Sequence, residues 1–228
     1  MESNGQNGQQ EQSGTTSTKN MSYIMNTKNW RGPLIFILII SILGVGMIGY
    51  QTYVDAPPMA GFKNQNGQVV MDQKAIERGQ EVFHNYALME YGSFFGDGAQ
   101  RGPDFTAEAL HEMTLAMSRY YITEFKTKTG NEPTANDVSQ IKEQVKLELK
   151  QNHVNSSDNM VTLSAAQLYA LEEVRKYYTN MFIDQNSGIG FPPKDYIKSR
   201  QETTDLGSFF FWGAWVCVTE RPGTNFSY

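Results

Sequence analysis

Cysteine is almost absent from this chain of 228 residues, which contains only Cys217. A single cysteine excludes an internal disulfide and any zinc site built from several thiolates. An excess of positive charge is absent too, because the formal net charge is −5 at pH 7. Nucleic-acid binding needs a basic patch to neutralise phosphates, so the sequence indicates no nucleic-acid partner.

Histidine is scarce, with three residues in the whole chain. His111 opens the sequence HEMTL, but the fourth residue after it is Leu115, so the zinc motif HExxH is not present. His84 stands alone beside Phe83 on a predicted helix, where a role at the helix surface competes with a role as a haem ligand. His153 stands at a predicted helix end and can interact with the helix dipole. The sequence therefore predicts no local metal site.

Motifs for nucleophilic or phosphate chemistry are missing as well. The chain has no GxSxG sequence, and its GDG sequence follows a predicted helix without a GK[ST] partner. Cys217 lies in the apolar run GSFFFWGAWVCV, where burial is expected to raise the pKa of its thiol and keep it unreactive. The sequence thus predicts no catalytic residue in this chain.

One long apolar run is present near the N-terminus. Residues 33–50 read PLIFILIISILGVGMIGY, without a charge, and the run continues to Val54. As a helix it would be roughly 33 Å long, which matches a hydrocarbon core of about 30 Å. The alternative is a signal peptide, whose apolar region is normally only about 7–15 residues long. We therefore expect an uncleaved transmembrane helix over residues 30–54, in contact with the lipid bilayer.

The charges on either side of this run predict its orientation. Lys19, Lys28 and Arg31 precede it, whereas Asp55 is the first charged residue after it. The positive-inside rule then places the N-terminus in the cytoplasm and the rest of the chain outside the cell membrane. Residues 1–29, rich in Gln, Asn, Gly, Ser and Thr, are expected to form a disordered cytoplasmic tail.

Residues 55–206 have the patterns of a mainly α-helical domain. The dipeptide Asn66-Gly67 between two short β-capable runs predicts a small β-hairpin. Apolar residues at helical spacing then predict four helices. Thr106 is the expected N-cap of the second helix, and SAAQ at Ser164 has the form of a capping box. The helices are expected over residues 73–90, 106–128, 134–152 and 164–182.

The last segment, residues 207–228, begins with the aromatic run GSFFFWGAWVCV. At about 12 residues this run is too short to span a bilayer. Its aromatic side chains suit either a membrane interface or a buried contact with another element. No folded ending is recognised after it, so we expect it to lead into a further membrane domain. The aromatic residues expected at that interface are Phe209, Phe210, Trp212 and Trp215.

Glycine is concentrated in the segment YGSFFGDGAQRGPD, which begins at Tyr91. Such a density implies left-handed backbone positions or a close approach of the backbone to something bulky. The adjacent Phe94 and Phe95 are unusual for a flexible surface loop. We therefore expect a shaped loop that packs against another surface. Its expected contact residues are Gly96, Asp97, Arg101 and Pro103.

Two stretches carry a family resemblance. YGSFFGDGAQRGPDFTAEALH and FFFWGAWVCVTERPGTNFSY resemble the N-terminal part of quinol-dependent nitric oxide reductases, which are single-chain relatives of the haem–copper oxidases in denitrification. The resemblance covers roughly residues 30–228. It implies a membrane helix and an extracytoplasmic cytochrome c-like domain, fused in the complete enzyme to a catalytic membrane domain. That enzyme reduces two NO to N2O and water, with quinol as the electron donor.

The same resemblance implies that haem c has been lost. In an ungapped alignment with the cytochrome c subunit of the two-chain relatives, the two haem-linking cysteines fall on Leu88 and Tyr91. The proximal histidine falls on Gly92. Covalent attachment and axial ligation would both be missing.

Further cofactors are implied for the complete enzyme. A calcium ion at the interface with the catalytic domain would contact Gly98 and Gln100 through their backbone. Haem b, haem b3 and non-haem iron would be held by residues beyond Tyr228. The resemblance thus implies no cofactor held by this chain alone and no catalysis by it alone.

A second interpretation of the residues stays open. The chain would be a single-pass membrane protein whose free-standing extracytoplasmic helical domain binds a partner or ligand and is not an enzyme. This explains the apolar helix and the four predicted helices. It leaves GSFFFWGAWVCV without a burial partner, and exposed aromatic surface of that size favours aggregation.

Overall fold

A computed structural model describes residues 27–96, 102–155, 157–184 and 192–228. The chain divides into two compact units, Met1–Ala56 and Pro57–Tyr228, which are described separately. Most of the tail expected to be disordered, residues 1–26, lies outside the described residues.

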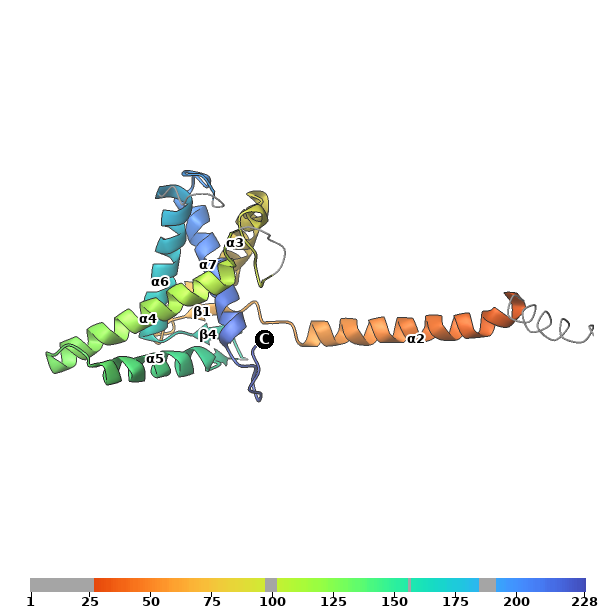
Figure 1. Ribbon diagram of the computed structural model, residues 1–228, viewed down its shortest axis with the longest axis horizontal. Helices are drawn as coiled ribbons and strands as arrows, with labels where there is room; N and C mark the ends of the chain where they lie inside the picture. Colours follow the sequence, from red (N-terminus) through yellow and green to blue (C-terminus); the bar gives the residue numbers. More distant parts are fainter. Residues whose placement is uncertain (1–26, 97–101, 156, 185–191) are drawn as a thin grey trace, which may run out of the picture. The chain divides into compact units, whose positions relative to one another are not determined.

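The first unit consists of helix α2, Thr27–Val54 (Figure 1). Its 25 residues from Trp30 to Val54 are long and apolar enough to cross a membrane. At 1.5 Å per residue they extend about 38 Å, which exceeds the hydrocarbon thickness of a bilayer. Large apolar side chains along the helix, such as those of Phe36 and Leu43, are exposed. The single N-terminal apolar helix predicted from the sequence is therefore present.

The second unit is mainly helical, as predicted, and contains a small sheet (Figure 1). Its helices surround a core of apolar side chains, and η1 and η2 are short helical turns between them. The elements are β1 (Gly61–Lys63), β2 (Val69–Met71), α3 (Gln73–Asn85), η1 (Leu88–Glu90), α4 (Phe105–Thr129), α5 (Ala135–Lys150), β3 (Val154–Asn155), β4 (Met160–Thr162), α6 (Ala165–Thr179), η2 (Asn180–Asp184) and α7 (Arg200–Val218).

Local capping explains where most of these helices begin and end. Asp72 precedes α3, and its carboxylate accepts the backbone N–H of Ala75. Thr134 and Ser164 each form a capping box, at the start of α5 and α6 respectively. Gly130 ends α4 with a φ of 73°. These starts and this stop agree with the predicted positions.

The start of α4 differs from the prediction by two residues. Its N-cap is Asp104, and the carboxylate of Asp104 accepts the backbone N–H groups of Thr106 and Ala107. The prediction of Thr106 as the cap is wrong because this residue is already inside the helix. Its hydroxyl instead accepts the backbone N–H of Phe95 at 3.1 Å.

The first predicted helix also ends early. α3 stops at Asn85 rather than near Glu90, because Ala87 adopts a left-handed φ of 48° that breaks the hydrogen-bond ladder. Residues Leu88–Glu90 then form the separate turn η1. The break turns Leu88 into the core, where its side chain is 0 % exposed.

The sheet is larger than the predicted hairpin. β1 and β2 pair antiparallel around Asn66-Gly67, which confirms the hairpin. β4 pairs with β1 in parallel and with β3 antiparallel, so the strand order is β2-β1-β4-β3. The sequence did not indicate β3 and β4, because strands of two and three residues are too short to show an alternating pattern.

Helix α7 forms the centre of the second unit and lies between α3 and α6 (Figure 1). It runs without a break through the boundary expected between residues 206 and 207. The sequence left two roles open for the aromatic run, and the structure shows the buried contact rather than an exposed interface. The buried aromatic residues of α7 are Phe209, Phe210, Phe211, Trp212 and Trp215.

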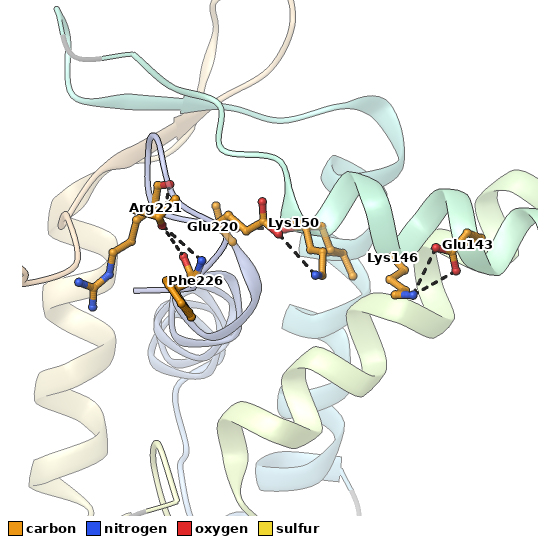
Figure 2. A network of polar contacts seen from close by, with 9 residues as sticks. Glu143, Lys146, Lys150, Glu220, Arg221 and Phe226 are labelled. Atoms are coloured by element: carbon orange, nitrogen blue, oxygen red, sulfur yellow. Dashed lines mark hydrogen bonds and ion pairs between the residues drawn. The ribbon is translucent and has the colours of Figure 1, made fainter.

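The chain after α7 folds back onto the domain, although no folded ending was expected. Glu220 forms an antiparallel bridge with Ser227, and its backbone N–H donates to the carbonyl of Lys150 at 3.0 Å. The side-chain amide of Asn152 donates to the carbonyl of Glu220 at 2.9 Å and to the hydroxyl of Tyr228 at 3.0 Å. Figure 2 shows how the ion pair between Lys150 and Glu220 attaches this turn to α5.

Candidate functional site

The candidate site is the region between α3 and α4, where the resemblance places the haem attachment. The side chain of Leu88 is fully buried in the core. Tyr91 packs against Tyr196, with ring centroids 5.1 Å apart. Tyr196 also donates a hydrogen bond to the carbonyl of Tyr86 at 2.9 Å. Ordinary protein side chains therefore occupy the two positions that would carry haem-linking cysteines.

The position of the proximal histidine is closed by packing. Gly92 is buried, and a Cβ atom added to it would lie 2.5 Å from Cε2 of Phe105 and 2.6 Å from the carbonyl oxygen of Pro103. Carbon atoms in proteins pack at about 3.5–4.0 Å, so no larger side chain fits without a shift of the backbone. The residues at positions 88, 91 and 92 do not fit a covalently attached haem c, because they provide neither thiols nor an imidazole.

A cluster of phenylalanines fills the interior beside this position. Phe94 stacks on Phe209 with centroids 4.4 Å apart, and Phe105 stacks on Phe210 at 4.9 Å. Phe83 contacts all four rings at 5.9–6.2 Å. Stacked and edge-on aromatic pairs stabilise a core beyond the area they bury. This packing takes the place of a cofactor as the centre of the domain.

The ends of the glycine-rich loop are joined at Asp104. One oxygen of its carboxylate accepts the hydroxyl of Ser93 at 3.0 Å and the backbone N–H of Gly96. The other accepts the backbone N–H groups of Thr106 and Ala107, each at 2.9 Å. Burial alone would raise the pKa of Asp104, but these hydrogen bonds outweigh it and hold the pKa below its ordinary value.

The backbone closes the same loop. The N–H of Ser93 donates to the carbonyl of Pro103 at 3.0 Å, and the N–H of Phe105 donates to the carbonyl of Ser93 at 2.9 Å. Gly102 has a φ of 82°, and a Cβ atom there would lie 1.7 Å from the carbonyl oxygen of Tyr91. Only glycine allows this approach, so the expectation of a shaped loop holds for the described part of the segment.

The structure tests the expected site residues unequally. Gly96 is exposed and Pro103 is half-buried, whereas Asp97, Gly98, Gln100 and Arg101 lie outside the described residues. Contact of Gly98 and Gln100 with calcium therefore stays a prediction. The aromatic residues expected at the interface with another domain are instead buried in this domain, where their rings pack on one another. The residues with this corrected position are Phe209, Phe210, Trp212 and Trp215.

The isolated candidates take ordinary positions. His84, His111 and His153 are all exposed, and the described part of the chain contains no group of His, Cys, Asp and Glu side chains that could hold a metal ion. Cys217 is exposed rather than embedded in the core. Loss of solvent around its sulfur, together with the charge of Asp104, still raises the pKa of its thiol, as predicted.

Sequence reasoning missed one ion pair that joins α3 to α7. Arg78 donates to both oxygens of Asp205, from Nε at 2.9 Å and from a terminal nitrogen at 3.0 Å. The Asp205 side chain is 7 % exposed, against 49 % for Arg78. The only signal in the sequence was an acidic residue just before an apolar run. The pair borders an open hollow of about 320 Å³.

A second arginine on this hollow also has its acceptors. Arg175 donates to the hydroxyl of Ser208 at 3.1 Å, to the carboxylate of Glu172 at 2.8 Å and to the carbonyl of Val70 at 3.3 Å. Both arginines are paired with carboxylates, so the hollow is balanced in charge. Its arrangement is suited to holding α3, α6 and β2 against α7 rather than to binding an anion.

Comparison with known proteins gives one match. A protein-family model for the cytochrome c-like domain of the nitric oxide reductase protein NorB matches residues 60–228. The matched range includes nearly all of the second unit, Pro57–Tyr228, and leaves α2 outside. No curated protein matches the chain.

Proposed function

Because the chain belongs to the NorB cytochrome c-like family of nitric oxide reductases, we propose that it is the haem-less cap and membrane anchor of a quinol-dependent enzyme. The complete enzyme would reduce two molecules of nitric oxide to nitrous oxide and water. Membership of the family carries the relation to nitric oxide reductases. The quinol donor, the loss of haem c and the status of this chain as one part of a larger enzyme are our proposal.

The closed position at Gly92 is the observation that carries the loss of haem. A haem c needs two thiols and an axial imidazole, whereas this framework has Leu88 and Tyr91 in the core region and Phe105 against Gly92. Quinol delivers its electrons from within the bilayer. An extracytoplasmic haem relay is then dispensable, and the domain can remain as a structural cap.

The other cofactors and partners belong to the complete enzyme. Haem b, haem b3 and non-haem iron would be bound by a catalytic membrane domain that continues after Tyr228, and calcium would lie at its contact with the glycine-rich loop. Helix α2 would anchor the cap in the cell membrane, with the N-terminus in the cytoplasm. This chain alone would then be inactive.

The proposal is tested by producing the full chain in cells that mature c-type cytochromes. We expect no haem-dependent stain on a denaturing gel and no haemochrome absorption. A genuine c-type cytochrome expressed in the same cells is the positive control. A covalently bound haem in the chain would overturn the proposed loss of haem c.

The electron donor is tested separately, with the complete open reading frame expressed in membranes. Nitric oxide consumption should be supported by a reduced quinol and not by a reduced soluble cytochrome c. The reverse preference would contradict the quinol assignment and leave the family membership untouched.

One observation favours the second interpretation, a free-standing binding domain. The aromatic run of α7 is buried within the second unit, so the objection that such a domain would expose it no longer applies. Affinity purification from native membranes separates the two functions. Recovery of a continuous polypeptide with a haem-containing membrane domain supports the cap, and recovery of the 228-residue chain without such a domain supports the binding domain.

A further inference from the structure

Three separate parts of the chain meet near the C-terminal end of α7. The indole N–H of Trp212 donates to the carbonyl of Pro58 at 3.1 Å, where the chain enters the second unit. The ring of Phe95, from the glycine-rich loop, lies 6.3 Å from the ring of Trp212. One turn further along α7, Trp215 packs against Tyr228 at 5.8 Å. We call this end of the domain the α7 pole, made up of Pro58, Phe95, Trp212, Cys217 and residues 219–228.

The α7 pole presents two exposed phenylalanines. Phe95 is 45 % exposed and Phe226 is 71 % exposed. The other phenylalanines of the second unit are buried or half-buried wherever the structure describes their side chains. Phe95 also keeps a left-handed φ of 58°, which is unfavourable for a bulky residue.

The exposed ring of Phe226 belongs to a fixed turn rather than to a free tail. The backbone N–H of Arg221 donates to the carbonyl of Phe226 at 2.7 Å, and Lys150 pairs with Glu220 at the base of the turn (Figure 2). A side chain on a fixed turn loses less freedom when it is immobilised at a surface.

The covalent link to α2 identifies what this surface meets. The apolar helix ends at Val54, and Pro58 is already held by Trp212. The four residue steps between them reach at most about 14 Å. Where α2 crosses a bilayer, its last apolar residues lie at the boundary between hydrocarbon and headgroups. The α7 pole is then within about 14 Å of that boundary.

We propose that the α7 pole is a lipid-contacting surface and that Phe95 and Phe226 insert into the headgroup layer of the bilayer crossed by α2. Aromatic rings are favourable at that depth. The proposal rests on the membrane anchoring by α2 given above, and adds a second point of attachment for the domain.

The single cysteine of the chain provides the test. The full chain is reconstituted into nanodiscs of phosphatidylcholine and phosphatidylglycerol, and a spin label is attached to Cys217. Collisions of the label with oxygen, which is concentrated in lipid, are compared with collisions with a water-soluble nickel chelate. The control places the label at Gln201→Cys in a Cys217→Ser background. Position 201 is exposed on the same helix and lies about 24 Å along its axis from position 217.

We expect an oxygen-to-nickel collision ratio several-fold higher at Cys217 than at Gln201→Cys. Phe226→Asp and Phe95→Ser should lower the ratio at Cys217, whereas Leu115→Asp, at a side chain that is 41 % exposed on α4, should not. A ratio at Cys217 equal to that of the control position overturns the proposal without any variant. A high ratio that neither phenylalanine variant changes overturns the role of the two rings.

The failure of the anchor can be recognised in the same preparation. A chain that does not co-elute with the nanodiscs contradicts anchoring by α2 and removes the basis of the lipid contact. A chain that co-elutes but carries a fully hydrated label at Cys217 contradicts only the lipid contact.

Discussion

A Cβ atom on Gly92 would lie 2.5 Å from Cε2 of Phe105. Gly92 is the position at which a cytochrome c of this family would place its proximal histidine, and Phe105 is the first residue of α4. Phe105 is itself fixed by its stacking on Phe210 at 4.9 Å. The loss of the haem ligand and the packing of the aromatic core are therefore one structural feature.

Gly92→Ala should destabilise the second unit. The added methyl group must displace Phe105 or the carbonyl of Pro103, and overpacking of this kind costs about 1–3 kcal/mol. Urea unfolding followed by circular dichroism measures the change. Gly49→Ala, where an added Cβ meets nothing within 4 Å, is the matched control and should leave unfolding of this unit unchanged. Equal stability of the Gly92 variant and the wild type would show that the site is not tightly packed.

Restoring the haem-binding residues alone should not restore haem. The triple variant Leu88→Cys, Tyr91→Cys and Gly92→His supplies the missing groups but places an imidazole where Phe105 lies. Expressed with c-type maturation, it should show no folded, low-spin haem spectrum. Adding Phe105→Ala opens the space and should increase haem incorporation. A normal spectrum from the triple variant alone would contradict the steric argument.

Removal of Arg78 should be costly because it strands a buried carboxylate. Asp205 is 7 % exposed, and a buried acceptor that loses its partner costs about 1–3 kcal/mol. Arg78→Ala should therefore lower the free energy of unfolding by this amount, and adding Asp205→Asn should recover part of it. Lys128→Ala, which breaks an exposed pair with Glu124, is the control and should change stability by less than about 0.5 kcal/mol.

The contribution of Asp104 should depend on pH. Its pKa is lowered in the folded state by hydrogen bonds that stabilise the carboxylate. Its contribution is therefore present above the ordinary carboxyl pKa of about 3.9 and is lost as the pH falls through the lower folded value. Asp104→Asn should cost about 0.5–2 kcal/mol at pH 7, as for the loss of a helix cap.

The difference between wild type and Asp104→Asn should shrink progressively below about pH 4. Thermal unfolding at several pH values measures it. Asp72→Asn, at a cap that accepts only the backbone N–H of Ala75 from its side chain, should cost less at pH 7. A pH-independent difference for Asp104→Asn would show that the charge of the carboxylate is unimportant.

Alkaline conditions should destabilise the second unit through its tyrosines. Burial raises the pKa of Tyr121, Tyr177 and Tyr178, and hydrogen bonds to Glu148 and Glu108 raise those of the first two further. Unfolded tyrosines ionise near pH 10, so the stability from these groups is present below that pH and falls as the pH rises above it. Tyrosinate absorbance and circular dichroism should therefore change together. Full ionisation of all tyrosines without unfolding would contradict this.

Features that depend on neighbours in the sequence were predictable. The capping boxes at Thr134 and Ser164, the stop at Gly130 and the hairpin at Asn66-Gly67 each rest on hydrogen bonds or backbone preferences within a few residues. The apolar helix ending at Val54 follows from composition alone. None of these features requires knowledge of where the rest of the chain lies.

Features that depend on distant partners were not predictable. The break at Ala87 arises because Leu88 is drawn into a core that other helices complete. β4 exists because β1, nearly one hundred positions earlier, offers it an edge in parallel. Asp104 became the cap of α4 because Ser93 and Gly96 approach its carboxylate from the other side of the loop.

The aromatic run of α7 marks the division most clearly. Its sequence determined that these side chains must leave water, because that many aromatic residues expose too large an apolar surface. The tertiary structure alone decided whether a membrane, another domain or this domain would cover them. It placed Phe209 and Phe210 against Phe94 and Phe105, and so filled with side chains the interior beside Gly92. Hydrophobic burial has no direction of its own, and only the packing of the surrounding helices gives it one.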